Sequence, residues 1–128
     1  MPTFPVVTGD VLTSTIFNGL PAFTVQTAKT VDYTAASGDE YQQLIPMNKA
    51  TAVAFKIPTD ASVAFAVGTA ITVLSIGAGA VTISATTSAT TTILSAGTVA
   101  AQPTLAQYKS AACIKTAANA WYVVGAIA

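Results

Sequence analysis

Residues 61–108 form a run of 48 residues without one charged side chain, and this run limits the possible folds more than any other feature. A membrane-spanning helix needs about 20 apolar residues, usually framed by Lys or Arg. The run is longer than any bilayer requires, and its most apolar window, residues 63–83, contains Gly68, Gly77 and Gly79. We therefore expect no membrane span, and instead a strand-rich domain whose neighbours cover part of its surface.

Apolar residues alternate with small or polar ones wherever the pattern is clear. Val53, Phe55 and Ile57 share one side of a strand over residues 52–57, and residues 63–67 and 80–84 repeat the pattern. This period of two predicts strands with one buried face. Residues 70–76 are apolar on both faces, which is typical of a central strand that is covered twice.

Turn residues separate these runs at short intervals. The link Gly77-Ala78-Gly79 joins two strand-like runs and predicts a hairpin in which glycine supplies a positive φ. Residues 104–118 fit a helix or a strand. We favour a strand, because Ser110, Ala112 and Ile114 alternate with Ala111, Cys113 and Lys115. Short strands at this spacing predict an all-β fold, a small antiparallel β-sandwich or barrel of the jelly-roll-like kind.

The amino-terminal residues show little alternation. Residues 1–30 contain Pro2, Pro5 and Pro21, which disfavour a helix or a central strand. We therefore expect two parts, an extended amino-terminal arm (1–30) and a β-strand domain (31–128). The alternative is that the arm folds onto its own domain as an edge strand.

The composition excludes several classes of function. Five lysines balance five acidic residues, with no arginine and no histidine, so the basic excess of a nucleic-acid binder is missing. Without histidine there is no serine triad, and Ser110 and Lys109 face opposite ways on a strand. The adjacent carboxylates Asp39 and Glu40 are expected in a solvated turn. We therefore expect no enzymatic activity and no catalytic residues.

Metal and cofactor sites are not expected either. Zinc sites need Cys and His, and the chain has a single cysteine, Cys113. The carboxylates are too dispersed for one calcium loop. Cys113 is expected to pack neutrally and to be partly exposed. Trp121 and Tyr122 are expected to lie in the core and at an edge, with a stacking platform for a base or sugar as the alternative.

Five short motifs occur in a recognisable order over about three quarters of the chain. They are Ile57-Pro58, Phe65 before Val67-Gly68-Thr69, Gly77-Ala78-Gly79 before Val81-Thr82-Ile83, Gln107-Tyr108, and Asn119 before Trp121, Val123 and Gly125. In this order the chain resembles a module found in virion proteins of tailed bacteriophages, in tail fibres, head fibres and capsid decoration proteins. The resemblance implies a homotrimeric structural protein of the phage particle.

The short length favours a capsid decoration (cement) protein over a fibre, with the receptor- or glycan-binding tip of a fibre as the alternative. The expected partners are other copies of the chain and the major capsid protein, and the expected location is the capsid surface, after synthesis in the host cytoplasm. We expect the arm to contact the capsid or a neighbouring subunit through its large apolar residues, which are Phe4, Val6, Val7, Ile16, Phe17, Leu20 and Phe23.

Overall fold

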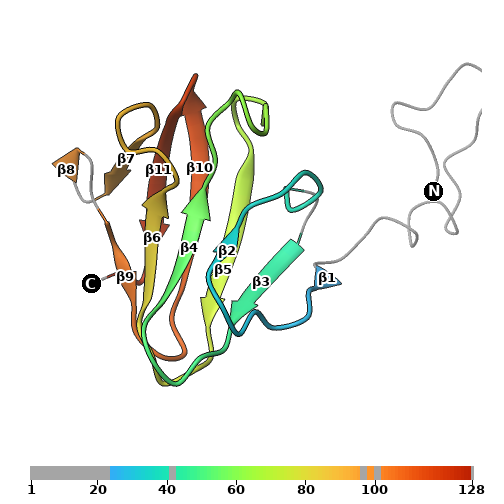
Figure 1. The fold of residues 1–128 in the computed structure, drawn as a ribbon, viewed down its shortest axis with the longest axis vertical. Helices are drawn as coiled ribbons and strands as arrows, with labels where there is room; N and C mark the ends of the chain where they lie inside the picture. Colours follow the sequence, from blue (N-terminus) through green and yellow to red (C-terminus); the bar gives the residue numbers. More distant parts are fainter. Residues whose placement is uncertain (1–23, 41–42, 96–97, 100–101, 128) are drawn as a thin grey trace, which may run out of the picture.

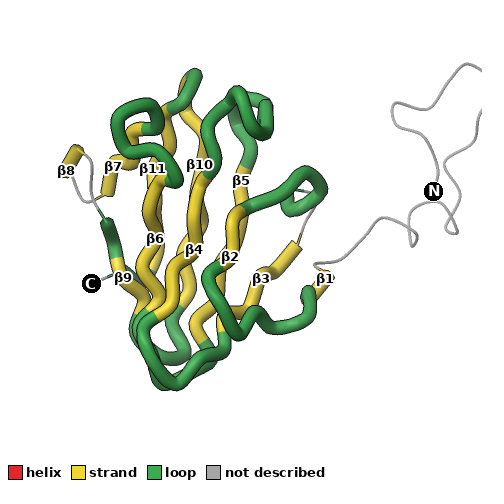
Figure 2. Tube along the Cα trace, viewed as in Figure 1, coloured by secondary structure: helices red, strands yellow, loops and turns green. Residues whose placement is uncertain are grey.

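A computed structural model describes residues 24–40, 43–95, 98–99 and 102–127. All regular structure in these residues is β, without a helix (Figures 1 and 2). The strands are β1 Thr24–Val25, β2 Tyr33–Thr34, β3 Gln43–Met47, β4 Val53–Ile57, β5 Ala70–Ser75, β6 Val81–Ala85, β7 Thr92–Ser95, β8 Thr98–Val99, β9 Thr104–Leu105, β10 Ser110–Ala117 and β11 Ala120–Gly125.

The strands form two sheets that face each other across one core (Figure 1). The large sheet has seven strands in the order β1-β3-β5-β10-β11-β7-β8, and the small sheet has four in the order β2-β4-β6-β9. The prediction of a small all-β sandwich is confirmed. Its strands were expected to be antiparallel, whereas the sheets are mixed: β1–β3, β3–β5, β2–β4, β4–β6 and β7–β11 are parallel pairs.

The parallel pairs arise because the first six strands alternate between the two sheets. Strands β1, β3 and β5 enter the large sheet, and β2, β4 and β6 enter the small one. The chain therefore winds in three successive coils, each stacked on the one before. The first coil is β1 and β2, the second is β3 and β4, and the third is β5 and β6. Strand β3 pairs with β5, and β4 with β6, at one constant offset of 28 residues: Leu44 lies beside Thr72, and Val53 beside Val81. This coiling replaces the jelly-roll-like connections.

The Gly77-Ala78-Gly79 link is the corner of the third coil and not a hairpin, since β5 and β6 lie in different sheets. It stacks on the corner of the second coil, where Gly79 N donates to Lys49 O at 2.9 Å. A Cβ on Gly77 would collide with the Lys49 backbone, and one on Gly79 with the Thr51 backbone, in each case at less than 3.0 Å. Close approach, and not a positive φ, requires glycine here.

The core lies where the alternation predicts it in β4, β5 and β6, but the strand predicted over residues 63–67 is wrong: these residues form a loop in which Phe65 is buried and Val67 is 65% exposed. Val53, Phe55 and Ile57 are buried in β4, and β5 and β6 continue the pattern. The Phe65 and Trp121 rings meet edge to face, with centroids 5.6 Å apart. Each such side chain gains about 1.5–3 kcal/mol on full burial, so these layers supply most of the stabilisation. The largest buried side chains are Trp121, Phe55, Ile45, Met47, Ile57, Ile71, Ile83, Ile93 and Leu105.

Residues 104–118 form strands, as predicted: β9 pairs with β6, and β10 pairs with both β5 and β11. Part of the expected arm also belongs to the sandwich. Within residues 24–30, β1 pairs with β3 and Lys29 bridges to Met47. The rest of the arm lies outside the described residues, so its separation from the strand domain stays a prediction.

Candidate interaction surface

The outer face of the large sheet is the most distinctive surface of the described structure. In β3, β5, β7, β10 and β11 alternate residues point into the core, so their neighbours point outward. None of these outward residues is charged, and the single lysine of the five strands, Lys115, is buried in the core. We call this surface the apolar face; it consists of Leu44, Thr72, Leu74, Leu94, Ala112, Ile114, Tyr122 and Val124.

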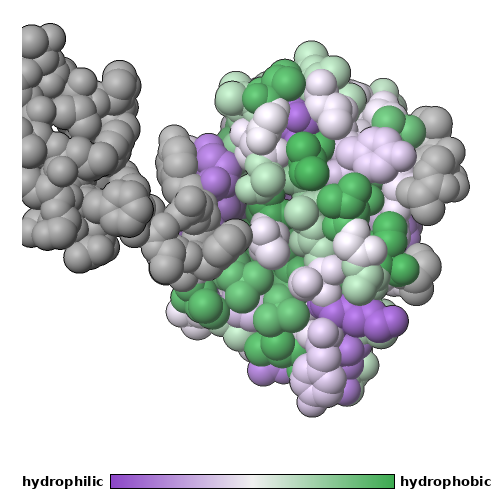
Figure 3. Space-filling view, turned by 180° about the vertical axis from the view of Figure 1, so that it is seen from behind, coloured by the Kyte–Doolittle hydropathy of each residue, from purple (hydrophilic) through white to green (hydrophobic). Residues whose placement is uncertain are grey.

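The strand register places these side chains in two continuous rows across the sheet. One row runs Leu44, Thr72, Ala112, Val124, and the other runs Ile114, Tyr122, Leu94. Val124 is 43% exposed, and the other seven are half-buried. Figure 3, which looks at the molecule from behind Figure 1, shows hydrophobic side chains spread over this side. The absence of charge across five neighbouring strands, and not an unusual patch size, makes this face the candidate interface.

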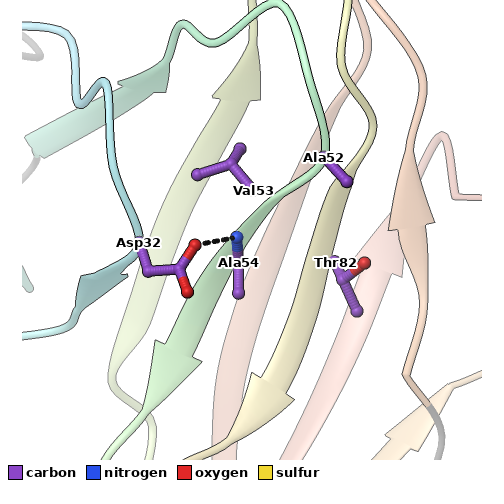
Figure 4. A pocket seen from close by; sticks show the side chains of 5 residues that line it. All are labelled: Asp32, Ala52, Val53, Ala54 and Thr82. Atoms are coloured by element: carbon purple, nitrogen blue, oxygen red, sulfur yellow. Dashed lines mark hydrogen bonds between the residues drawn. The ribbon is translucent and has the colours of Figure 1, made fainter.

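The outer face of the small sheet is more polar. Its strands turn Lys56, Thr82, Ser84 and Thr104 outward. A hollow of about 220 Å³ opens beside Asp32, lined by Ala52, Val53, Ala54 and Thr82 (Figure 4). The Asp32 carboxylate there already accepts a hydrogen bond from Ala54 N at 3.0 Å and lies 3.9 Å from Lys56 Nζ. Asp32 therefore extends the β2–β4 pairing through one carboxylate oxygen, and its side chain remains 54% exposed.

Asp39 was expected in a solvated turn, and this prediction is wrong, because Asp39 is 5% exposed. Its carboxylate accepts hydrogen bonds from Gln26 Nε2, Tyr33 Oη and Ala36 N at 2.7–2.8 Å. Burial and the neighbouring Asp39 raise the pKa of Tyr33 to about 12, and Lys29 Nζ lies 4.4 Å above the Tyr33 ring. The cluster ties the first coil to the loop after β2.

Glu40 does not form an acid–base pair with Asp39. Its Oε1 accepts a hydrogen bond from Gly38 N at 2.6 Å, which closes the turn that Gly38 makes at φ +106°. Paired carboxylates catalyse when substrate can reach both of them. Here the Asp39 carboxylate is bound by Gln26, Tyr33 and Ala36, and the Glu40 carboxylate is bound by Gly38.

Lys115 is buried in β10, on the same face as Cys113. Its Nζ pairs with Asp60 Oδ1 at 2.8 Å and donates to Phe65 O. The backbone N of Asp60 donates a hydrogen bond to Asn119 Oδ1, and Asp60 Oδ2 accepts one from Asn119 N. The Lys115 hydrogen bond holds the pKa of Asp60 below its usual value. The ion pair joins the β4–β5 loop to strand β10, and the Asn119 hydrogen bonds join the same loop to the β10–β11 turn.

The remaining candidates have structural roles. Ser110 is exposed and points to the opposite side of β10 from Lys115, so these two cannot form a dyad. Cys113 was expected to be partly exposed, but it is fully buried, and this raises its thiol pKa to about 12. Trp121 is in the core, as predicted. Tyr122 lies on the apolar face, in an internal strand and not at an edge.

Several residues of the five short sequence motifs occupy special backbone positions. Gly68 and Gly125 have φ of +94° and +141°, and Tyr108 and Asn119 have φ of +67° and +50°. Gly68 N donates to Lys115 O, and Tyr108 N donates to Ser75 O. The motif residues thus hold turns and corners in place, and they do not gather into a chemical site.

The described residues contain no group of three or more His, Cys, Asp and Glu side chains placed to hold a metal ion. No helix in them is long and apolar enough to span a membrane. No family model, curated protein or solved structure matches the chain. The expected contact residues Phe4, Val6, Val7, Ile16, Phe17, Leu20 and Phe23 all lie outside the described residues.

Proposed function

We propose that this protein is a homotrimeric structural protein of a tailed-bacteriophage particle, and that it acts as a decoration protein on the outside of the head. It strengthens the shell by binding to the major capsid protein. The order of the phage-like motifs along the chain supports the phage assignment. The single observation that supports self-association is the uncharged apolar face.

The contrast between the two sheets supports this role. The apolar face turns Leu74, Ile114 and Tyr122 outward, whereas the small sheet turns Lys56, Ser84 and Thr104 outward. A sandwich with one apolar and one polar outer face suits a subunit that buries one side against copies of itself. The other side then remains in solvent. Charge keeps domains apart in solution, and the apolar face lacks it.

The positions of the aromatic side chains also favour a cement protein over a fibre tip. A receptor-binding tip would display aromatic side chains on exposed loops. Trp121 is instead in the core, Tyr33 is bound to Asp39, and Tyr122 lies on a strand. Tyr108, 75% exposed, is the one highly exposed aromatic side chain in the part of the chain that the structure describes.

Self-association is tested by a matched pair of threonine substitutions. Thr72 is central on the apolar face, between Leu44 and Ala112, and Thr82 is its counterpart on the small sheet, between Ala54 and Thr104. Thr72→Lys places a charge in the interface and is expected to give monomers by light scattering. Thr82→Lys is expected to remain trimeric. Equal behaviour of the two variants, or a monomeric unaltered protein, contradicts the proposal.

The phage assignment has its own test. Purified protein added to heads that lack decoration is expected to bind in a fixed ratio to the major capsid protein, measured by quantitative mass spectrometry. It should also raise the temperature at which the heads release DNA. Absence of binding to heads, or only a few copies at the tail, contradicts a decoration role.

A further inference from the structure

The strongest unexplained feature is the apolar face, and the question is what covers it. The face spans five strands and about four residues along each strand. At spacings of about 4.8 Å between strands and 3.3 Å along them, it measures roughly 300 Å² in plan. Stable interfaces bury about 800 Å² on each partner. The face alone is therefore too small to hold a trimer, and a second surface must contribute.

The sequence supplies such a surface at one edge of this same sheet. Residues 1–23 precede β1, which is the edge strand next to β3. They carry one charge, Asp10, and a high proportion of large apolar side chains. Fully extended, 23 residues reach about 75 Å. The apolar face is only about 20 Å wide across its five strands, so the segment is long enough to cross a neighbouring subunit.

We propose that residues 1–23 of each subunit dock on the apolar face of the next subunit. This inference rests on the proposed homotrimer and specifies how its subunits are joined. The chemistry of the two surfaces matches, because neither an uncharged sheet face nor a segment with one charge must desolvate ion pairs on contact. Three such exchanges, head to tail around a threefold axis, close a ring and leave no arm or face unused.

The exchange also places the segment where it contacts the largest number of strands. A segment lying across the two rows contacts the side chains of β3, β5, β10 and β11 together, and Thr72 and Ala112 lie near the middle. Burial of the large apolar side chains of residues 1–23 against this face is the driving force for docking.

Cross-linking of the full-length chain tests the exchange. One variant carries Thr15→Cys in the segment and another carries Thr72→Cys on the apolar face. The native Cys113 is fully buried and stays unreactive, so it gives no background. The two variants are refolded together and treated with a flexible bismaleimide. A covalent dimer joining one chain of each kind is expected.

The matched control replaces Thr72→Cys with Thr82→Cys on the small sheet. The Thr15–Thr72 yield is expected to be at least about tenfold higher, because docking holds the thiols at millimolar effective concentration while free chains are micromolar. A chain that carries both Thr15→Cys and Thr72→Cys, diluted with an excess of unaltered protein, distinguishes exchange from self-docking. Under exchange its internal cross-link is rare.

The outcomes separate this inference from the proposed function. A trimer whose cross-links form within single chains, or whose Thr72 and Thr82 yields are equal, overturns the exchange and leaves the decoration role standing. Links between chains in a protein that does not bind heads support the exchange and overturn the decoration role.

Discussion

Replacing Gly79 with alanine tests whether the stacked corners hold the coils together. A Cβ at Gly79 would lie well inside 3.0 Å of the Thr51 backbone, which cannot rotate away as a flexible side chain could. Overpacking of this kind costs about 1–3 kcal/mol. Separation of the corners also weakens the hydrogen bond from Gly79 N to Lys49 O, which is worth about 1 kcal/mol.

Alanine has less conformational freedom than glycine in the unfolded chain, and this offsets about 0.4–1 kcal/mol of the cost. The net loss is therefore about 2–3 kcal/mol, a large part of the 5–15 kcal/mol typical of a folded domain. In urea, with a slope of about 1–3 kcal/mol per molar, the midpoint should fall by about 0.7–3 M. The measurement is equilibrium unfolding followed by tryptophan fluorescence, since Trp121 is fully buried.

The control lies one residue away. Ala78 is exposed between the two glycines, so Ala78→Ser should change stability by less than about 0.5 kcal/mol. All variants are compared at one protein concentration, because association stabilises folded subunits. If the free energy of unfolding of Gly79→Ala lies within about 0.5 kcal/mol of the value for the unaltered protein, which is the usual effect of a surface substitution, the corners are not in close contact. The argument that stacked corners hold the coils together is then refuted.

Three further predictions follow from the buried polar groups. Asp60→Ala leaves the Lys115 charge buried without its partner and should cost about 3–5 kcal/mol in urea unfolding; a cost below 1 kcal/mol would contradict a structural ion pair. Because the pKa of Asp60 is lowered on folding, its contribution is present above the ordinary carboxyl pKa of about 4 and is lost as pH falls further; in Asp60→Asn this part of the acid dependence should disappear. The pKa of Tyr33 is raised on folding to about 12, so its contribution to stability is complete below about pH 10 and is lost between pH 10 and 12. Tyr33→Phe should therefore remove the part of the tyrosinate absorbance that appears at the highest pH. An unchanged titration curve would count against the Asp39 contact.

The alternation predicted the buried faces of β4, β5 and β6 because it depends on burial, but it also predicted a strand over residues 63–67, which form a loop. Val53, Phe55 and Ile57 point inward whatever their strand pairs with. The same alternation carries no information about the partner strand or its direction, so the parallel pairing of β4 with β6 was missed. The 28-residue offset was missed for a related reason: Leu44 and Thr72 occupy equivalent positions on the apolar face without resembling each other.

The polar clusters depended on contacts between distant parts of the chain. Asp39 can be buried because Gln26 and Tyr33 donate hydrogen bonds to its carboxylate from the first coil. Lys115 can be buried because its Nζ pairs with Asp60, a residue 55 positions away in the sequence. Gly77 and Gly79 show a different ambiguity. Glycine serves equally for a positive φ and for close backbone approach, and the sequence alone does not distinguish the two.

The topology also fixes an order of assembly during synthesis. Through β6, every strand after the first coil stacks on a coil that has already been made. Strand β7 breaks this order, because its parallel partner β11 begins at Ala120 while β7 begins at Thr92. At about 5–20 residues per second, β7 leaves the ribosome roughly 1–6 s before that partner exists. The internal strand β11, which joins β7 to the rest of the large sheet, is thus the last of the described strands that the ribosome makes.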